Sequence, residues 1–320
     1  MEFSHIPIML AECIEGLAIR PDGLYLDGTA GGAGHSHEIA ARLTSGHLYA
    51  LDQDPDAIAA ATARLAGMPA TVLQGNFRRA GALLAPCGVT HLDGALLDLG
   101  VSSHQLDDRE RGFSYLGDAP LDMRMSQTGP TAADLLASLD RAEIARILKE
   151  YGEEPYAWQI AGKIVAAREK APVATTAQLA ALVASAMPPA ERRKDKNPAR
   201  RSFQAIRIAV NGELDALSEG LDEIFRLLAP GGRFCVITFH SLEDRLVKQR
   251  FRQWCTACTC PPEFPVCVCG GRAQARQITH KPLEANAAEQ QDNRRARSAK
   301  LRIIEKTDAP AKAALPSRGR

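Results

Sequence analysis

Short apolar runs alternate with amphipathic stretches along the first third of the chain. Four runs, each typical of a buried strand, lie at residues 24–26, 47–51, 70–73 and 94–100. Between them, residues 35–43 and 55–66 place apolar side chains at helical spacing. Strands that alternate with helices predict an α/β fold with a parallel, Rossmann-like sheet.

The alternation stops near residue 105 and returns after residue 198. Helical patterns alone fill the interval, beginning at Thr131 and Asp140 and covering residues 156–169 and 176–187. The spacing of Asp140 and Glu143 is that of a capping box at a helix start. This interval therefore predicts an all-helical insertion into the α/β fold.

Alternation after the insertion completes the expected sheet. The predicted elements are a long helix over 206–228, a turn at 229–232, a strand over 233–239, a helix over 243–254 and a last strand over 300–306. We thus expect three regions. Residues 1–106 and 199–306 form one discontinuous α/β domain, residues 107–198 form a helical insert that recognises substrate, and residues 307–320 form a disordered basic tail.

Composition restricts the class of protein further. Of 320 residues, 45% are hydrophobic and 24% charged, which is ordinary for a globular protein. A net charge of +1 predicts no global attraction to nucleic acid, so any such attraction requires local basic patches. The N-terminal segment is not a signal peptide, and no apolar run is long enough to cross a bilayer. We therefore expect a cytoplasmic protein without a membrane partner; the oligomeric state is left open.

A glycine-rich loop follows the first predicted strand. Asp27 ends that strand, and the loop runs Gly28-x-x-Gly31-Gly32-x-Gly34, which does not fit the dinucleotide fingerprint. An anion at Asp27 would repel a pyrophosphate and would attract the ammonium group of a methionine moiety. The loop therefore favours S-adenosylmethionine over a nicotinamide dinucleotide.

Polar or aromatic side chains stand at the end of each of the four predicted strands, namely Asp27, Asp52, Phe77 and Asp98. In an open parallel sheet these ends share one edge, where ligands bind. Asp52, about twenty residues after the glycines, is placed to accept hydrogen bonds from ribose hydroxyls. The four strand ends predict a single cofactor site.

Five cysteines crowd into one segment, at positions 255, 258, 260, 267 and 269. Such spacing can hold zinc, and in a cytosolic chain a metal is favoured over disulfides. Five thiols do not make one tetrahedral set, however, and a reduced loop punctuated by proline is favoured over a zinc site. We assign no metal and leave both interpretations open.

Long segments of the chain resemble the bacterial small-subunit rRNA cytosine-N4 methyltransferases, the RsmH or MraW family. The segments that carry the resemblance are 5–10 (HIPIML), 27–36 (DGTAGGAGHS), 51–61 (LDQDPDAIAAA), 93–115, 120–125 (PLDMRM), 151–155 (YGEEP), 197–214, 230–248 and 294–302. The resemblance spans nearly the whole chain. It implies a class I S-adenosylmethionine-dependent methyltransferase fold with a helical insert, and methylation of the exocyclic N4 amine of a cytidine in the decoding region of 16S rRNA. At position 33, alanine stands where the family commonly has glycine.

The resemblance also implies roles for particular residues. The expected cofactor contacts are Ala33, Gly34 and His35 at the methionine portion, Asp52 at the ribose, Phe77 at the adenine, and Asp98 and Gln105 near the reactive end. Asp98, or backbone carbonyls beside it, is the candidate that accepts hydrogen bonds from N4. Phe239, His240 or Phe113 would stack on the base.

Two basic runs, residues 191–201 and 294–302, are candidates for contacts with rRNA phosphates. Two alternatives from other classes remain. One is a non-catalytic, cofactor-binding ribosome assembly factor, and the presence of Asp52 and Asp98 counts against it. The other is a nicotinamide oxidoreductase, and the spacing of the glycine loop and Asp27 count against it.

Overall fold

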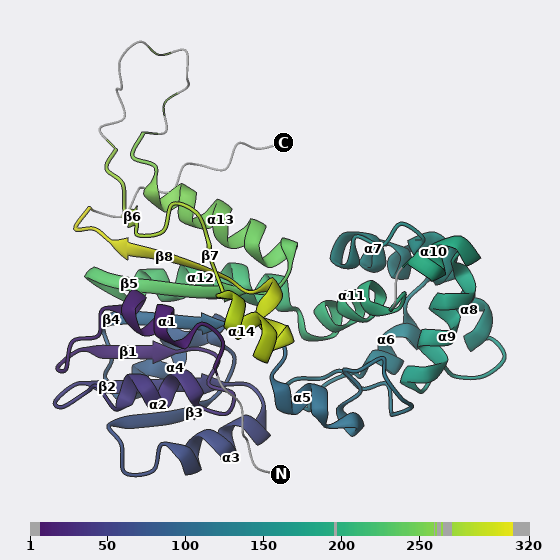
Figure 1. The fold of residues 1–320 in the computed structure, drawn as a ribbon, viewed down its shortest axis with the longest axis horizontal. Coiled ribbons are helices and arrows are strands. Elements are labelled where there is room, and N and C mark those ends of the chain that lie inside the picture. Colours follow the sequence, from purple (N-terminus) through teal and green to yellow (C-terminus); the bar gives the residue numbers. More distant parts are fainter. Residues whose placement is uncertain (1–6, 195–196, 259, 261–263, 265–270, 310–320) are drawn as a thin grey trace. The chain divides into compact units, whose positions relative to one another are not determined.

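The computed structural model describes residues 7–194, 197–258, 260, 264 and 271–309. The chain divides into two compact units (Figure 1). Glu2–Gly100 and Ala216–Arg320 make up the first, called here the sheet unit, and Val101–Asp215 make up the second, the helical unit. The helical unit is thus inserted into the sequence of the sheet unit.

One mixed sheet runs through the sheet unit. Its strands are β1 (Leu24–Asp27), β2 (His47–Asp52), β3 (Ala70–Gln74), β4 (Leu92–Asp98), β5 (Leu228–Thr238), β6 (Ala275–Gln277), β7 (Leu283–Glu284) and β8 (Lys300–Lys306). The order is β3-β2-β1-β4-β5-β8-β6, and β7 also pairs with β8. Strands β1 to β5 are parallel, whereas β8 is antiparallel to β5. The predicted α/β sheet is confirmed.

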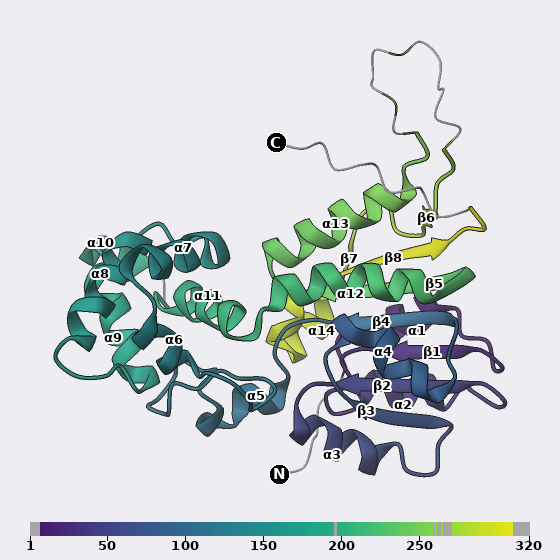
Figure 2. The same cartoon turned by 180° about the vertical axis from the view of Figure 1, so that it is seen from behind.

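Alternate residues of each central strand pack on opposite faces of the sheet, because successive side chains of a strand point in opposite directions. In β2, Leu48 and Ala50 join one buried cluster, and Tyr49 and Leu51 join the other. Helices α1 (Leu10–Leu17), α2 (Gly34–Ala40) and α3 (Pro55–Arg64) cover the first face. Helices α4 (Ala80–Leu84), α12 (Glu213–Leu227) and α13 (Ser241–Cys255) cover the second, as the views from both sides show (Figures 1 and 2).

The helical unit has its own core. Its helices are α5 (Ser103–Asp107), α6 (Ala132–Ser138), α7 (Arg141–Gly152), α8 (Ala157–Arg168), α9 (Thr176–Ala186), α10 (Pro189–Lys194) and α11 (Arg200–Asn211). The predicted capping box of Asp140 and Glu143 is present at the start of α7. Phe203 and Ile206 of α11 are buried in this core, so the unit ends at Asp215 rather than at the expected boundary of residue 198.

Two predicted elements differ in the structure. The single helix expected over 206–228 is two helices, α11 and α12, because Gly212 between them has a φ of +58°. The turn expected at 229–232 lies inside β5, where the register with β4 shifts between Leu92 and Gly94. The strand predicted over 300–306 is present as β8, but it is not the edge of the sheet, since β6 lies beyond it. Strand β6 is only three residues long and gives no periodic signal.

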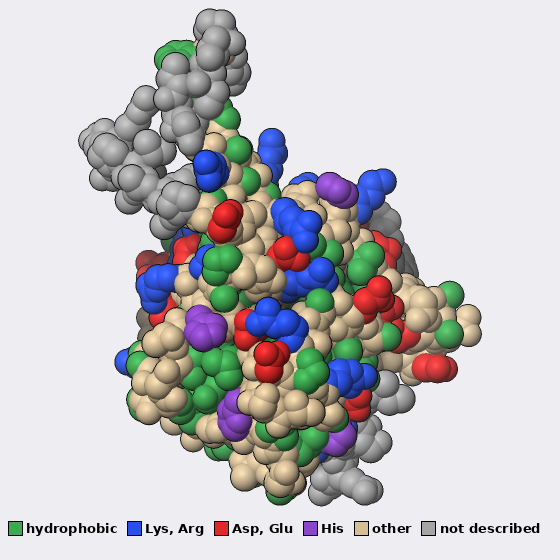
Figure 3. All heavy atoms as spheres, turned by 90° about the vertical axis from the view of Figure 1, so that its left-hand side faces the viewer, with side chains coloured by type: hydrophobic (Ala, Val, Ile, Leu, Met, Phe, Trp, Pro, Cys, Tyr) green, Lys and Arg blue, Asp and Glu red, His purple; other side chains and the backbone are tan. Residues whose placement is uncertain are grey.

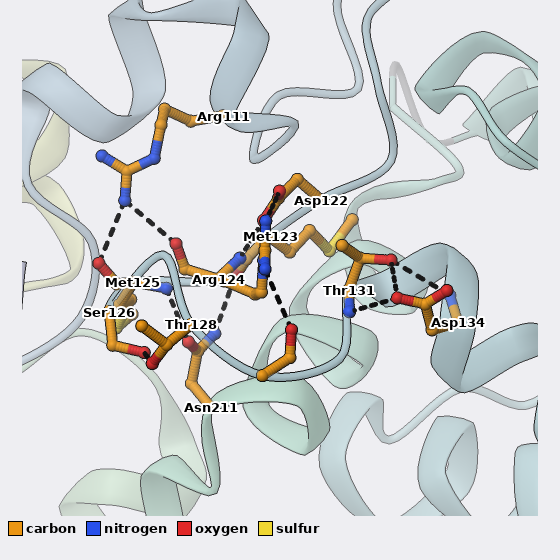
Figure 4. Close-up of polar contacts among 11 residues, drawn as sticks. Arg111, Asp122, Met123, Arg124, Met125, Ser126, Thr128, Thr131, Asp134 and Asn211 are labelled. Carbon is orange, nitrogen blue, oxygen red and sulfur yellow. Dashed lines mark hydrogen bonds and ion pairs between the residues drawn. The ribbon is translucent and has the colours of Figure 1, made fainter.

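The loop between α5 and α6 is held by side chains rather than by regular structure (Figure 4). Asn211 donates to the carbonyl oxygen of Met123 (2.8 Å) and accepts from the backbone N–H of Met125 (2.8 Å). The buried Arg111 guanidinium donates to the carbonyl oxygens of Arg124 and Met125. Met123 has a φ of +63°, a strained conformation for a side chain of this size, which these contacts maintain.

Acidic and basic side chains lie interspersed on the face of the molecule drawn in Figure 3. Such mixing agrees with the low net charge of +1 and gives this face no broad field of one sign. Among the described residues, no helix combines the length and the apolar character needed to cross a bilayer.

Candidate functional site

The carboxyl ends of the parallel strands bring three aspartates to one rim of the sheet. Asp27 pairs with Ala50 on one side and Leu96 on the other, so that β2 and β4 each extend two residues further, to Asp52 and Asp98. The rim joins these strands to the glycine-rich loop, because Gly28 donates to the carbonyl of Leu96 and Ala30 to that of Leu51. The predicted convergence of these carboxyl groups at one edge is therefore present in the structure.

Two residues of the loop adopt the left-handed backbone conformation, Gly31 with a φ of +50° and Ala33 with a φ of +57°. Ala33 is fully buried and precedes the first turn of α2. Two other glycines serve close packing: a Cβ on Gly28 would lie 2.5 Å from Leu97, and one on Gly34 would collide with Pro7. The backbone of the loop is thus packed closely against neighbouring side chains.

Asp27 does not face a ligand, in contrast to the prediction that it attracts the ammonium group. Its side chain is 1% exposed, and its two oxygens accept from the backbone N–H of Thr29 (3.1 Å) and the hydroxyl of Ser36 (2.6 Å). Burial raises its pKa. Asp27 therefore holds the loop against α2 and acts on a ligand only through its charge.

Asp52 ends β2 with its carboxylate turned to the loop. Its oxygens accept from the backbone N–H groups of Gly31 (2.8 Å) and Asp54 (2.9 Å). Burial raises its pKa to about 6, against the opposing effect of these two hydrogen bonds. Each carboxylate oxygen has a second lone pair, so the group retains capacity to accept hydroxyl donors.

Asp98 ends β4 and is the strongest sign of a ligand. Its backbone N–H donates to the hydroxyl of Thr29 (2.7 Å), while its side-chain Oδ1 is buried without a hydrogen-bond partner in the described part of the chain. Burial, together with the negative charges of Asp27 and Glu243, raises the pKa of Asp98 to about 8. An unpaired buried carboxyl oxygen is costly, and a donor or cation from a ligand would relieve that cost.

His35 faces Asp98 from the first turn of α2. Its Nε2 lies 3.1 Å from the carbonyl oxygen of Ile8, which only accepts, so Nε2 carries the hydrogen. Burial lowers its pKa to about 4. The imidazole is therefore neutral at pH 7, and its Nδ1, 3.8 Å from Asp98 Oδ2, is an acceptor rather than one half of an ion pair.

The remaining predicted residues divide between the units. Phe77 follows β3, is half-buried and contacts the sheet unit at Gly28 and at Gly220 of α12. Gln105 is 4% exposed in the helical unit, where its side chain completes a capping box with Ser102. Phe113 is 6% exposed within the helical core and is not available to stack on a base.

At the end of β5, His240, which the sequence offered as a candidate for base stacking, pairs with Glu243, which was not predicted as part of the site. Glu243 is 2% exposed, and its carboxylate accepts from the backbone N–H groups of Phe239 (2.8 Å) and His240 (3.2 Å). His240 Nε2 lies 3.0 Å from the same carboxylate. His240 and Glu243 form a capping box at the start of α13. The spacing is visible in the sequence, but histidine is an unusual first residue for a capping box.

Two other sequence features are only partly described. Cys267 and Cys269 lie outside the described residues, so the cysteine segment gives no ligand set. In the basic run 294–302, Arg302 is 9% exposed and paired with Asp244 at 2.7 Å, which removes it from the candidates for phosphate contact. Arg294 and Arg297 of the same run are exposed.

A parallel sheet with a tight glycine loop and carboxylates at one rim defines a Rossmann-like α/β protein with a site for a nucleoside-containing cofactor. The chain belongs to the MraW methylase family, whose model matches residues 2–307. This confirms the resemblance found in the sequence.

Relatives match over almost their whole length. The protein named ribosomal RNA small subunit methyltransferase H from Symbiobacterium thermophilum is 52% identical to this chain, and the alignment covers 97% of this chain and 98% of that protein. The protein of the same name from Geobacter sulfurreducens is also 52% identical, and the alignment covers 96% of this chain and 100% of that protein. Solved structures match less closely. An rRNA methylase from Streptococcus thermophilus covers 95% of this chain and 100% of its own, with 10% identity and a TM-score of 0.43, from which we infer nothing further.

Proposed function

We propose that this protein is an S-adenosylmethionine-dependent methyltransferase that modifies the exocyclic N4 amine of a cytidine in the 16S rRNA of the small ribosomal subunit. Membership of a methylase family supports methyl transfer, and the names of the relatives support a small-subunit rRNA substrate. The buried, unpaired Oδ1 of Asp98 carries the assignment of the site. Such a substrate would place the reaction in the cytoplasm.

The residues present fit this cofactor. Asp52 offers acceptors to the ribose, Phe77 offers a half-buried ring beside the adenine, and the raised pKa of Asp98 marks a place where positive charge is favoured. Ala33, Gly34 and the neutral His35 would lie along the methionine portion. Gln105, which the resemblance assigns to the reactive end, belongs to the helical unit, so it is not placed against these residues. When bound, S-adenosylmethionine supplies an electrophilic methyl group on a sulfonium.

The amine of cytosine is a weak nucleophile, because its lone pair is delocalised into the ring. The protein must therefore hold N4 in position and accept hydrogen bonds from its N–H groups. We assign this role to Asp98 or to backbone carbonyls beside it, and base stacking to Phe239 at the end of β5. We assign RNA contacts outside the site to the helical unit.

Transfer of label tests the proposal. The purified protein would be incubated with S-adenosylmethionine labelled in the methyl group and with small subunits from a strain lacking the modification, and radioactivity would be counted in the rRNA. We expect saturable incorporation by the wild type and at least a hundredfold loss with Asp98→Ala. Cofactor binding without incorporation would contradict the proposal and indicate the assembly factor.

A further inference from the structure

An exposed tryptophan stands over a fixed arginine on the surface of the helical unit. Trp158 in the first turn of α8 is 53% exposed. The guanidinium carbon of Arg141, the first residue of α7, lies 4.2 Å from the centre of its ring, and Arg141 Nη2 donates to the carbonyl oxygen of Trp158 (3.2 Å). Such contacts order both side chains, although each is on the surface.

Gly162 determines which side of the indole the arginine occupies. A Cβ at Gly162 would lie 2.9 to 3.1 Å from three atoms of the Arg141 guanidinium. The guanidinium is therefore held between the backbone of α8 and one face of the indole. The arginine contacts one face of the indole, and Trp158 remains 53% exposed with the arginine in place.

No carboxylate neutralises this arginine in the part of the chain that the structure describes. A positive charge therefore lies against one face of the indole. Exposed arginines of the same unit, Arg192, Arg200 and Arg201, lie in the basic run that follows α9. A flat aromatic face backed by a cation is a combination that binds unpaired nucleobases.

We propose that Trp158, backed by Arg141, is a stacking platform for an unpaired base of the RNA substrate, outside the catalytic site. The proposal rests on the proposed function, because it supposes an RNA substrate. It assigns to α8 a contact that sets substrate affinity and leaves methyl transfer itself unchanged.

The test uses tryptophan fluorescence, because the chain has only two tryptophans. Trp254 is 6% exposed and stacked on Phe225, so a Trp254→Phe variant reports on Trp158 alone. Titration of this variant with a single-stranded oligocytidylate should quench the emission saturably. Absence of quenching, or quenching by ribosomal proteins and not by RNA, would overturn the proposal.

Kinetics with unmethylated small subunits give the second readout. Loss of one base stack is expected to raise KM about tenfold in Trp158→Ala at unchanged kcat and cofactor affinity, whereas Trp158→Phe stays within about threefold of wild type. Leu116→Ala, which removes another exposed apolar side chain of the same unit (67%), is the matched control and should change nothing. Unchanged KM in Trp158→Ala with an active wild type would refute the platform alone, whereas an inactive wild type that binds cofactor would refute the proposed function.

Discussion

Replacing Asp98 by asparagine removes an ionisable group from the rim and keeps the shape of the side chain. In the native protein, burial and the charges of Asp27 and Glu243 raise the pKa of Asp98 to about 8, so the neutral form predominates at pH 7. A bound cation favours the ionised form. Cofactor binding below pH 8 must therefore release a proton from Asp98, at a cost of about 1.4 kcal/mol for each pH unit below the pKa.

The size of the effect follows from this cost and from the strength of one ion pair. At contact distance and an effective dielectric constant of about 20, the pair contributes about 4 kcal/mol. After subtraction of the proton cost, about 4 kcal/mol remain at pH 9, about 2.6 at pH 7 and about 1.3 at pH 6. The Asp98→Asn variant should then bind S-adenosylmethionine roughly 700-fold, 70-fold and 10-fold more weakly than wild type. Screening at a side chain that is 24% exposed lowers all three values together and preserves their order.

Isothermal titration calorimetry at the three pH values measures these ratios. S-adenosylhomocysteine, which lacks the sulfonium charge, is the matched ligand and should show little difference between the two proteins. Asp22→Asn, at a carboxylate that is 75% exposed before β1, is the matched variant and should bind like wild type. A ratio that does not change with pH, or an equal loss for both ligands, would refute an ion pair between Asp98 and the sulfonium of the cofactor.

Three further substitutions test the structural account. Ala33→Gly should leave the free energy of unfolding within about 0.5 kcal/mol of wild type, because relief of the left-handed backbone strain offsets the lost burial of a methyl group. Ala33→Val should lower the free energy of unfolding by at least about 2 kcal/mol, and unfolding in urea distinguishes the two variants. Asn211→Ala removes side-chain hydrogen bonds to Met123, Met125 and Arg207 and should lower the free energy of unfolding by about 2 kcal/mol. The backbone amide of Met125 should then exchange its hydrogen faster, and an unchanged rate would show that Asn211 does not hold this loop. Lys306→Met leaves the carbonyl oxygens of Phe225, Arg226 and Leu228 without their ammonium donor and should lower the free energy of unfolding by about 1 to 3 kcal/mol. An equal or higher midpoint of unfolding in urea would show that these three hydrogen bonds do not stabilise the protein.

The rim of the sheet was predictable because it depends on local pattern. Apolar runs of strand length that end in Asp52 and Asp98 indicate both the strand and the edge at which its last side chain lies. Parallel pairing then brings the ends together without further information from the sequence. The role of Asp27 was not predictable in the same way, since only the structure shows that Thr29 and Ser36 occupy both of its oxygens.

Features that depend on distant contacts escaped the sequence. Asn211 bonds to Met123 across 88 positions, so no local pattern indicates that the loop before α6 is fixed. The break at Gly212 could have been inferred from the glycine itself, but the apolar spacing on both sides concealed it. The stack of Trp158 on Arg141 requires α7 and α8 to be packed side by side. Only this packing shows that a side chain at Gly162 would collide with the guanidinium.

The identity of the methylated nucleoside tests the central claim most directly. Labelled rRNA from the reaction with small subunits would be digested to nucleosides and separated by chromatography coupled to mass spectrometry, with synthetic N4-methylcytidine and 5-methylcytidine as standards. The account predicts that the label co-elutes with N4-methylcytidine. Label in 5-methylcytidine, in a ribose methyl group or in another base would contradict the account.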